Sequence, residues 1–249
     1  MTRKLFILPY MKIVFLLLIT IMIPCYYGLM YGGDTGKSYF DIYTAIVVDK
    51  FREVMRNGNE TLEIPIMDPF KLDQFEYNIR EKFNIEAQGY LQNLQINKLS
   101  TYKIIQAEFH LFRIKVNVHY IWDSIELITD YNLTGIYEHF LPIYGLGEID
   151  AIVKGLDVEV IMGLWIKNGY LYVRNLQSAI KLEELDIKVT GLFNNKHISN
   201  IISIILSNVA PQLVDIYQEE LTELLNTSAT DIINDLQKNN TLWDLIFNS

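Results

Sequence analysis

Apolar and polar side chains alternate along the middle of the chain, a pattern typical of strands with one buried and one solvated face. From Phe109 to Trp122 the even positions from Phe112 onward are apolar, and a second run from Ile125 to Tyr137 puts Tyr131 on the apolar side and Asn132 on the solvated side. Because clean alternation with short turns is typical of antiparallel sheets, we predict such a sheet. Further strands are predicted at Ile149–Ile166, Tyr170–Val173 and Leu185–Val189.

After Gly191 the apolar residues recur at the three- and four-residue spacing of a helix, and this spacing continues from Asn195 to Gln237. A single helix of that length would measure about 60 Å. We expect a kink at Pro211, which lacks a backbone N–H, and an interruption at Asn226–Ser228. Residues 201–206 are apolar on more than one side, so we expect the helix to be surrounded; an ordinary core helix is the alternative. The predicted fold class is α+β.

A shorter amphipathic helix is predicted ahead of the sheet. Ser38 and Asp41 match a capping box, and Asn57-Gly58 ends the helical spacing. The next segment, Ile64–Phe70, holds two prolines, which keep the residues before them out of the helical region. It is therefore predicted to be an extended connector.

The first residues have the pattern of a secretory signal. Arg3 and Lys4 precede the apolar run Ile13–Ile23, which is shorter than the roughly 20 apolar residues that a membrane span needs. We predict a signal peptide over residues 1–25, or one that starts at Met11, and secretion of the chain. An uncleaved membrane anchor is the alternative. Residues 26–37 are expected to form a flexible segment and residues 38–249 a single domain.

Composition and charge narrow the classes of function. The chain has 249 residues, 50% of them hydrophobic, which is enough for one large core. Its formal net charge is −9 with Lys and Arg scattered, unlike the basic surface of a protein that binds nucleic acid or anionic membranes. The single cysteine, Cys25, falls at the predicted cleavage site, so we expect no disulfide, no thiol nucleophile and no cysteine metal site in the mature chain.

Four Asn-x-Ser/Thr sequons follow the predicted signal, and together they favour passage through the secretory pathway. Each lies in a polar or turn-like context where a glycan could be accommodated. These candidate glycosylation sites are Asn59, Asn132, Asn226 and Asn239.

Residue patterns that suggest catalysis or cofactor binding are incomplete. Residues 32–38 look like a phosphate-binding loop, but Tyr31 stands where that motif needs its first glycine. The four histidines show no metal-ligand spacing, and the acidic pair Glu183-Glu184 is more typical of a solvated turn than of acid–base catalysis. We therefore predict no enzyme, no cofactor and no metal site.

Several short motifs occur in the order and spacing of one known family. Tyr131-x-Leu133-x-Gly135 and the segment Leu141–Gly147 resemble the Tyr-Leu-Gly and Leu-Pro-Ile-x-Gly-x-Gly signatures of the insect haemolymph juvenile hormone-binding and takeout proteins. The resemblance covers Tyr39 to Phe247, and mite group 7 allergens are the nearest other match. Further similar segments are Ile66–Phe70, Leu94–Ser100, Leu192–Asn195 and Leu242–Phe247.

The resemblance implies that a strongly curved antiparallel sheet wraps the long helix and leaves an apolar tunnel. It implies a secreted haemolymph glycoprotein that transports a hydrophobic ligand, such as a juvenile hormone-like terpenoid or a fatty acid, without catalysis. The family's N-terminal cysteine pair has no counterpart here. Candidate lining residues, for which plain core packing is the alternative, are Phe112, Val116, Tyr120, Trp122, Val160, Met162, Leu164, Ile201 and Ile205.

Two other functions fit the same sequence. An interaction or allergen-like protein would fill its interior with its own side chains, for which 16 Tyr and 12 Phe supply the volume. A membrane-anchored lipid-transfer protein would keep its N-terminus uncleaved. A hydrophobic small molecule is the expected partner, with an unidentified receptor as a further candidate; no nucleic acid and no stable membrane insertion after signal cleavage are expected.

Overall fold

Six antiparallel strands form one sheet in a computed structural model that describes residues 52–58, 65–82, 85–110, 115–167 and 170–236. The antiparallel sheet was predicted, whereas its first strand, at residues 70–82, was not. The strand order is β1-β2-β4-β5-β6, and β3 pairs with β4 beyond the end of β2. The predicted signal peptide, the segment 26–37 and most of the predicted first helix lie outside the described residues. The strands are β1 (Phe70–Lys82), β2 (Ile85–Asn97), β3 (Lys103–His110), β4 (Lys115–Tyr137), β5 (Leu141–Lys167) and β6 (Tyr170–Val189).

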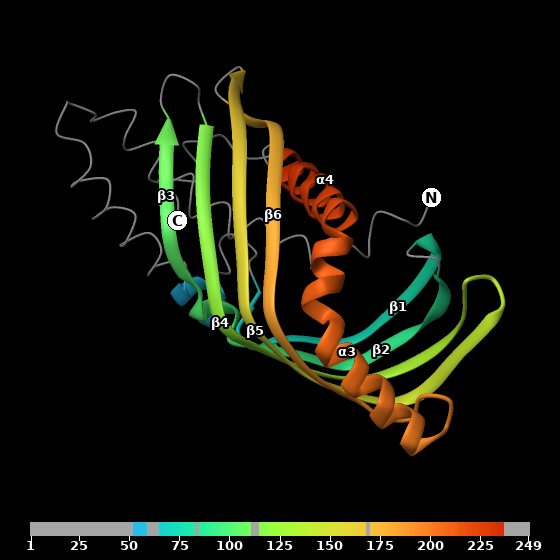
Figure 1. The fold of residues 1–249 in the computed structure, drawn as a ribbon. Coiled ribbons are helices and arrows are strands. Elements are labelled where there is room, and N and C mark those ends of the chain that lie inside the picture. Colours follow the sequence, from blue (N-terminus) through green and yellow to red (C-terminus); the bar gives the residue numbers. More distant parts are fainter. Residues whose placement is uncertain (1–51, 59–64, 83–84, 111–114, 168–169, 237–249) are drawn as a thin grey trace.

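The three longest strands run through both halves of a bent sheet (Figure 1). Residues 115–121 of β4 pair with β3, whereas residues 126–137 pair with β2. We call the part that contains β3 the first half and the part that contains β1 and β2 the second half. Because β4, β5 and β6 belong to both halves, the shape of the sheet is set by where these strands bend.

The bend coincides with a line of three residues, Asp123, Gly155 and Glu183, which we call the crease. Side chains on the same face of a regular strand are two residues apart, but Trp122 and Ile125 of β4 are three apart and both are buried. The pairing of β4 with β5 has the same register on both sides of the crease. Gly155 has a φ of 59°, a conformation that favours glycine, and the Glu183 side chain fills the space beside it. The inward face therefore switches from even to odd positions at the crease.

Each half of the sheet has its own hydrophobic cluster on the inner face. The second-half cluster is built from buried Tyr131, Val189 and Leu192. In the first half the rings of Tyr102 and Tyr120 meet edge to face at 5.5 Å. The first-half cluster consists of Met55, Met67, Tyr102, Val116, Val118, Tyr120, Trp122, Ile125, Val160, Met162, Leu164, Val173, Leu176 and Ala229.

The C-terminal region forms two helices rather than the single helix predicted. These are α3 (Lys196–Ile216) and α4 (Gln218–Leu236), and Tyr217 separates the two helices. Pro211 lies inside α3, and the expected interruption at Asn226–Ser228 is wrong because these residues lie inside α4. Figure 1 shows α3 on the concave side of the sheet and α4 continuing in a different direction.

Two predicted strand boundaries are also wrong, both at the crease. β4 joins the runs predicted separately at 109–122 and 125–137, and β6 joins those at 170–173 and 185–189. Residues 109–110 belong to β3 instead. The pair Glu183-Glu184, predicted as a solvated turn, lies inside β6, where Glu184 accepts a hydrogen bond from Lys154 at 2.5 Å. Charged residues at a bend within a strand resemble charged residues at a turn between strands.

The segment before β1 is tied to the loop after β2. Helical residues 52–57 end at Gly58 with a φ of 73°, where the sequence predicted the end of the first helix. The Asp68 carboxylate accepts hydrogen bonds from the backbone N–H groups of Lys98 and Ser100, both at 2.8 Å. Ser100 belongs to the short 3-10 helix η1 (Leu99–Thr101). These hydrogen bonds hold the segment before β1, which contributes Met55 and Met67 to the first-half cluster, against the loop after β2.

We predict that Gly155→Ala lowers the free energy of unfolding by about 1–2 kcal/mol, because a residue with a Cβ is strained at positive φ and would displace the Glu183 side chain. Gly155→Asn should lower the free energy of unfolding less than Gly155→Ala does, because asparagine tolerates positive φ better than alanine. Urea denaturation of the two variants and the wild type measures the difference, and equal stability of the two variants would contradict the role assigned to this backbone conformation.

Candidate ligand-binding site

The turn between β6 and α3, residues 190–195, lies directly against β5. The backbone N–H of Thr190 donates to the Glu148 carbonyl at 2.9 Å, and that of Phe193 donates to the Tyr144 carbonyl at 2.8 Å. The Tyr131 hydroxyl donates to the Thr190 carbonyl at 2.7 Å. Asn195 then caps α3 by accepting from backbone N–H groups of its first turn. The start of α3 is thus held by the sheet.

Two glycines of β5 make this close approach possible. A Cβ on Gly147 would lie under 3.0 Å from backbone atoms of Thr190, and one on Gly145 would lie 2.6 Å from the Tyr131 hydroxyl. Gly145 also pairs with Leu192 of the turn. These glycines and Tyr131 belong to the motifs that resemble the takeout family. The motifs therefore position α3, and they do not by themselves identify a ligand.

Two tyrosine hydroxyls are held in the second half of the sheet. Tyr77 of β1 donates to the Asn132 carbonyl at 2.9 Å, and burial raises the pKa of its hydroxyl. Burial, followed by repulsion from a charged Tyr77, raises the pKa of the Tyr131 hydroxyl to about 12. Both hydroxyls therefore stay protonated at neutral pH and act as hydrogen-bond donors.

Small polar residues of α3 face the edge strand β6. The backbone N–H of Val189 donates to Ser203 Oγ at 2.9 Å, and that of Ile187 donates to Ser207 Oγ at 3.0 Å. Ser199, one turn earlier, is also buried. Because unpaired N–H groups at a sheet edge are a liability, this row of serines both attaches the helix and covers the edge.

The opposite face of α3 is apolar and exposed. Ile201 is 57% exposed and Ile205 is 51% exposed, and Ile198, Ile204 and Ile216 are exposed as well. Among the described residues α3 is the one helix long and apolar enough to cross a membrane by length and composition, and only 17% of its most apolar stretch is buried. Core helices of soluble proteins pass the same test. In α3, however, the fully buried residues are small (Ser199, Ser203 and Ala210), and most of the isoleucines are exposed.

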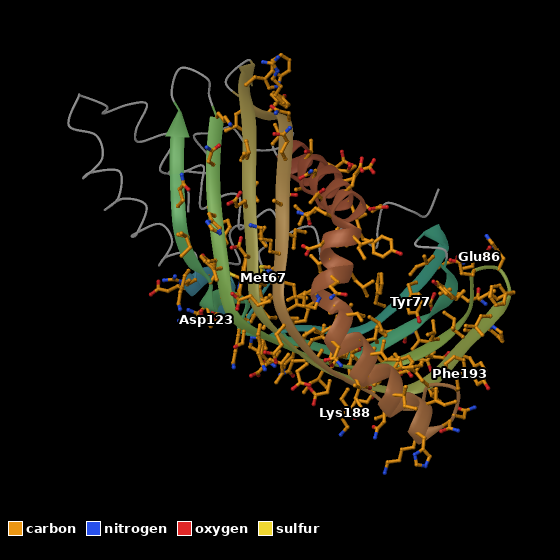
Figure 2. All side chains as sticks on the ribbon, in the orientation of Figure 1. Met67, Tyr77, Glu86, Asp123, Lys188 and Phe193 are labelled. Carbon is orange, nitrogen blue, oxygen red and sulfur yellow. The ribbon has the colours of Figure 1, made fainter. Side chains whose placement is uncertain are left out.

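The inner face of the second half is also partly open. Ile79 and Tyr137 are each 40% exposed, although their strands place them on the side of Tyr131. Phe75, Leu91 and Leu133 on the same face are only half-buried. Figure 2 shows Tyr77 on this concave side, between β1 and α3. The described residues therefore leave apolar surface uncovered on the sheet and on α3 alike.

The structure separates the nine predicted lining residues into two groups. Phe112 lies outside the described residues. Ile201 and Ile205 are on the exposed face of α3, outside both hydrophobic clusters. The other six, which pack together in the first-half cluster, are Val116, Tyr120, Trp122, Val160, Met162 and Leu164. Whether any of the nine contacts a ligand stays a prediction.

The open surface of β1 was not predicted from the sequence. The segment Phe70–Lys82 carries Phe75, Tyr77 and Ile79 at alternate positions, which is the signal of a strand. Phe70 and Leu72 occupy even positions, whereas Phe75, Tyr77 and Ile79 occupy odd ones, because β1 also switches its inward face. This switch interrupts the alternation along the strand. A search for shorter alternating runs would have found it.

Two histidines of the described residues each lie beside one carboxylate. His119 Nε2 lies 2.9 Å from Asp157 Oδ1 on the outer face, and His139 Nδ1 lies 3.5 Å from Glu86 Oε1 near the β4–β5 hairpin. Within the described ranges, no three His, Cys, Asp or Glu side chains come together as metal ligands would. These pairs are polar contacts between side chains of the sheet and its hairpin.

A bent antiparallel sheet with an apolar helix on its concave side defines the takeout-like fold. The crystal structure of Epiphyas postvittana Takeout 1 matches with a TM-score of 0.58 and 15% sequence identity, over 80% of this chain and 94% of that one. The match shows the fold and confirms the predicted α+β class, with a sheet that is curved and not closed.

The chain belongs to the haemolymph juvenile hormone binding protein family, whose model matches residues 40–246. This confirms the family that the sequence motifs indicated. The crystal structure of a lipopolysaccharide binding protein is also similar, with 15% identity over 79% of this chain and 38% of that one, but its TM-score of 0.34 carries no argument. No curated protein matches the sequence.

We predict that the stability lost in Tyr131→Phe depends on pH. Below pH 10 the variant lacks one hydrogen bond and loses about 1 kcal/mol. From pH 10 to about 12 the unfolded wild type releases the Tyr131 proton while the folded protein retains it, so wild-type stability falls and the difference narrows. Urea denaturation from pH 8 to 12 measures this change. Parallel stability curves for the two proteins would contradict the raised pKa.

Proposed function

We propose that this protein is a secreted, non-catalytic carrier of a hydrophobic small molecule such as a terpenoid or a fatty acid. The ligand would lie between the exposed isoleucine face of α3 and the open inner face of β1, β2 and the end of β4. Family membership supports a carrier fold for hydrophobic ligands. The observation that carries the proposal is the exposure of Ile201 and Ile205 on a helix whose fully buried residues are Ser199, Ser203 and Ala210.

The two halves of the sheet support different roles. The first half contains a large cluster of fully buried inward side chains, surrounded by half-buried ones such as Leu156 and Val158, which provides stability without a ligand. In the second half apolar residues that face inward remain half-exposed. A protein that only filled its own interior would bury these side chains too. The open second half therefore favours a carrier over the interaction protein with a filled core that the sequence also allowed.

The energetics of such a site favour long apolar ligands. Burial of one CH₂ contributes about 0.8 kcal/mol, so a dozen contribute roughly 10 kcal/mol. Association costs about 4–15 kcal/mol, which leaves little net affinity for a short ligand. Tyr77 and Tyr137 add polar ends to the apolar surface, and a ligand with one polar group would use them.

The first test is the identity of what the protein carries. Protein isolated from its native source and extracted with organic solvent should release a lipid detectable by mass spectrometry, and the delipidated protein should bind a fluorescent fatty acid at micromolar concentration. The carrier proposal fails if extracts hold no lipid and the fluorescent probe does not bind.

A second test locates the ligand. The double variant Ile201→Asp/Ile205→Asp should bind the fluorescent fatty acid at least about tenfold more weakly, a loss of 1.4 kcal/mol. Because both side chains are exposed, its free energy of unfolding should stay within about 0.5 kcal/mol of the wild type.

The matched control is Ile128→Asp/Ile136→Asp, which introduces the same two charges at exposed isoleucines on the outer face of β4. Its affinity for the probe should stay within about twofold of the wild type, since no ligand contact is proposed there. Equal loss of affinity in both proteins would indicate a general effect of negative charge, and the proposed location between α3 and the second half would then be wrong.

A further inference from the structure

The outer face of the second half carries exposed apolar side chains beside a sequon. Leu146 of β5 is 62% exposed, and Tyr144 on the same face is 41% exposed. In the β4–β5 register Leu146 is the direct partner of Asn132, and Tyr144 is the partner of Thr134. Directly opposed Cβ atoms in antiparallel strands lie about 5 Å apart. The sequon and the apolar side chains therefore occupy one small surface.

Asn132 points away from the hydrophobic cluster. Its neighbours Tyr131 and Leu133 belong to the inner cluster, so strand alternation places Asn132 and Thr134 on the outer face. The Asn132 side chain is partly exposed, and no hydrogen bond to its amide group is found among the described residues. Its backbone carbonyl accepts from the Tyr77 hydroxyl. A substituent on Asn132 would therefore lie on the outer face, away from the second-half cluster.

Asn226, the other sequon asparagine within the described residues, lies in a different environment. Its Oδ1 accepts a hydrogen bond from Ser178 Oγ at 2.8 Å, which ties α4 to β6. Ala229, three residues on, is fully buried in the first-half cluster. A bulky glycan on Asn226 Nδ2 would crowd this contact between α4 and β6. The two sequons therefore differ in the room that they leave for a glycan.

We propose that Asn132 carries an N-linked glycan that covers Leu146 and Tyr144, and that Asn226 stays unmodified. This inference rests on the proposed secretion. In the reaction Asn132 Nδ2 bonds to C1 of the sugar of a lipid-linked oligosaccharide donor, the bond from C1 to the lipid diphosphate breaks, and the lipid diphosphate leaves with the electron pair. The amide proton is released to solvent.

A glycan is the occupant that fits the size and position of this surface. The apolar residues number only a few, whereas a stable interface between two proteins buries about 800 Å² on each partner. The carbon-bound hydrogens of a sugar ring give it an apolar face that matches leucine and tyrosine, and its hydroxyls restore a polar surface. A glycan at Asn132 thus replaces an exposed apolar patch with a solvated one.

The experiment uses the full chain, secreted from cultured eukaryotic cells and digested for glycopeptide mass spectrometry. We expect most copies to be modified at Asn132 and none at Asn226. Asn132→Gln should increase retention of the secreted protein on a hydrophobic interaction column. Combining Asn132→Gln with Leu146→Thr should return retention toward that of the glycosylated wild type, because the exposed leucine is gone.

The outcomes separate this inference from the proposed function. Modification at Asn59 or Asn239 with Asn132 unmodified would overturn the inference and leave secretion intact. Modification at Asn226 would overturn the inference that this asparagine stays unmodified. Modification at Asn132 with unchanged column retention of Asn132→Gln would overturn the covering role. A chain that reaches the medium with none of the four sequons modified would likewise refute the inference, and a chain that never enters the secretory pathway would refute the proposed secretion itself.

Discussion

The arrangement of this protein depends on how closely the turn between β6 and α3 approaches β5. The approach needs Gly145 and Gly147, because any side chain there would collide with the turn or with the Tyr131 hydroxyl. Once the turn is in place, α3 can only run along β6, where serines meet the free backbone N–H groups of the strand edge. The isoleucines must then face away from the strand. The exposure of the most apolar side of α3 follows from the way its start is attached.

The crease divides the sheet into a part that is packed and a part that is open. Gly155 lets three continuous strands change their inward parity, so one sheet forms two hydrophobic clusters without interrupting its hydrogen bonds. The first-half cluster is tightly buried and is closed by residues from the segment before β1 and by α4. The second half is held by hydrogen bonds of Tyr77 and Tyr131 as well as by apolar contacts. Rigidity and available apolar surface are thus provided by separate regions of one sheet.

Much of the architecture could be predicted from the sequence because it depends on local periodicity. Alternation identified the sheet and placed Asn132 on its outer face, helical spacing identified the C-terminal helical region, and Gly58 marked the end of the first helix. The errors occurred where a backbone irregularity changed the pattern. The parity change at Asp123 looked like the end of a strand, and the break at Tyr217 has no glycine or proline to announce it. Periodicity in a strand or a helix predicts which side chains share a face, but it does not tell a packed face from an open one. That distinction depends on contacts between segments far apart in the chain.

The serine contacts of α3 have a consequence for the order in which the molecule comes apart. The bonds from Val189 to Ser203 and from Ile187 to Ser207 join residues 14 and 20 positions apart, whereas the Tyr131 hydroxyl bonds to a carbonyl 59 positions away. Loop-closure entropy makes the longest of these contacts costlier than the shortest by about 1 kcal/mol. β6 and α3 therefore form a local unit whose pairing persists longest when neighbouring strands separate. By the same reasoning the pairing of β2 with β4, which joins distant residues such as Tyr90 and Asn132, would separate before the helix leaves its strand.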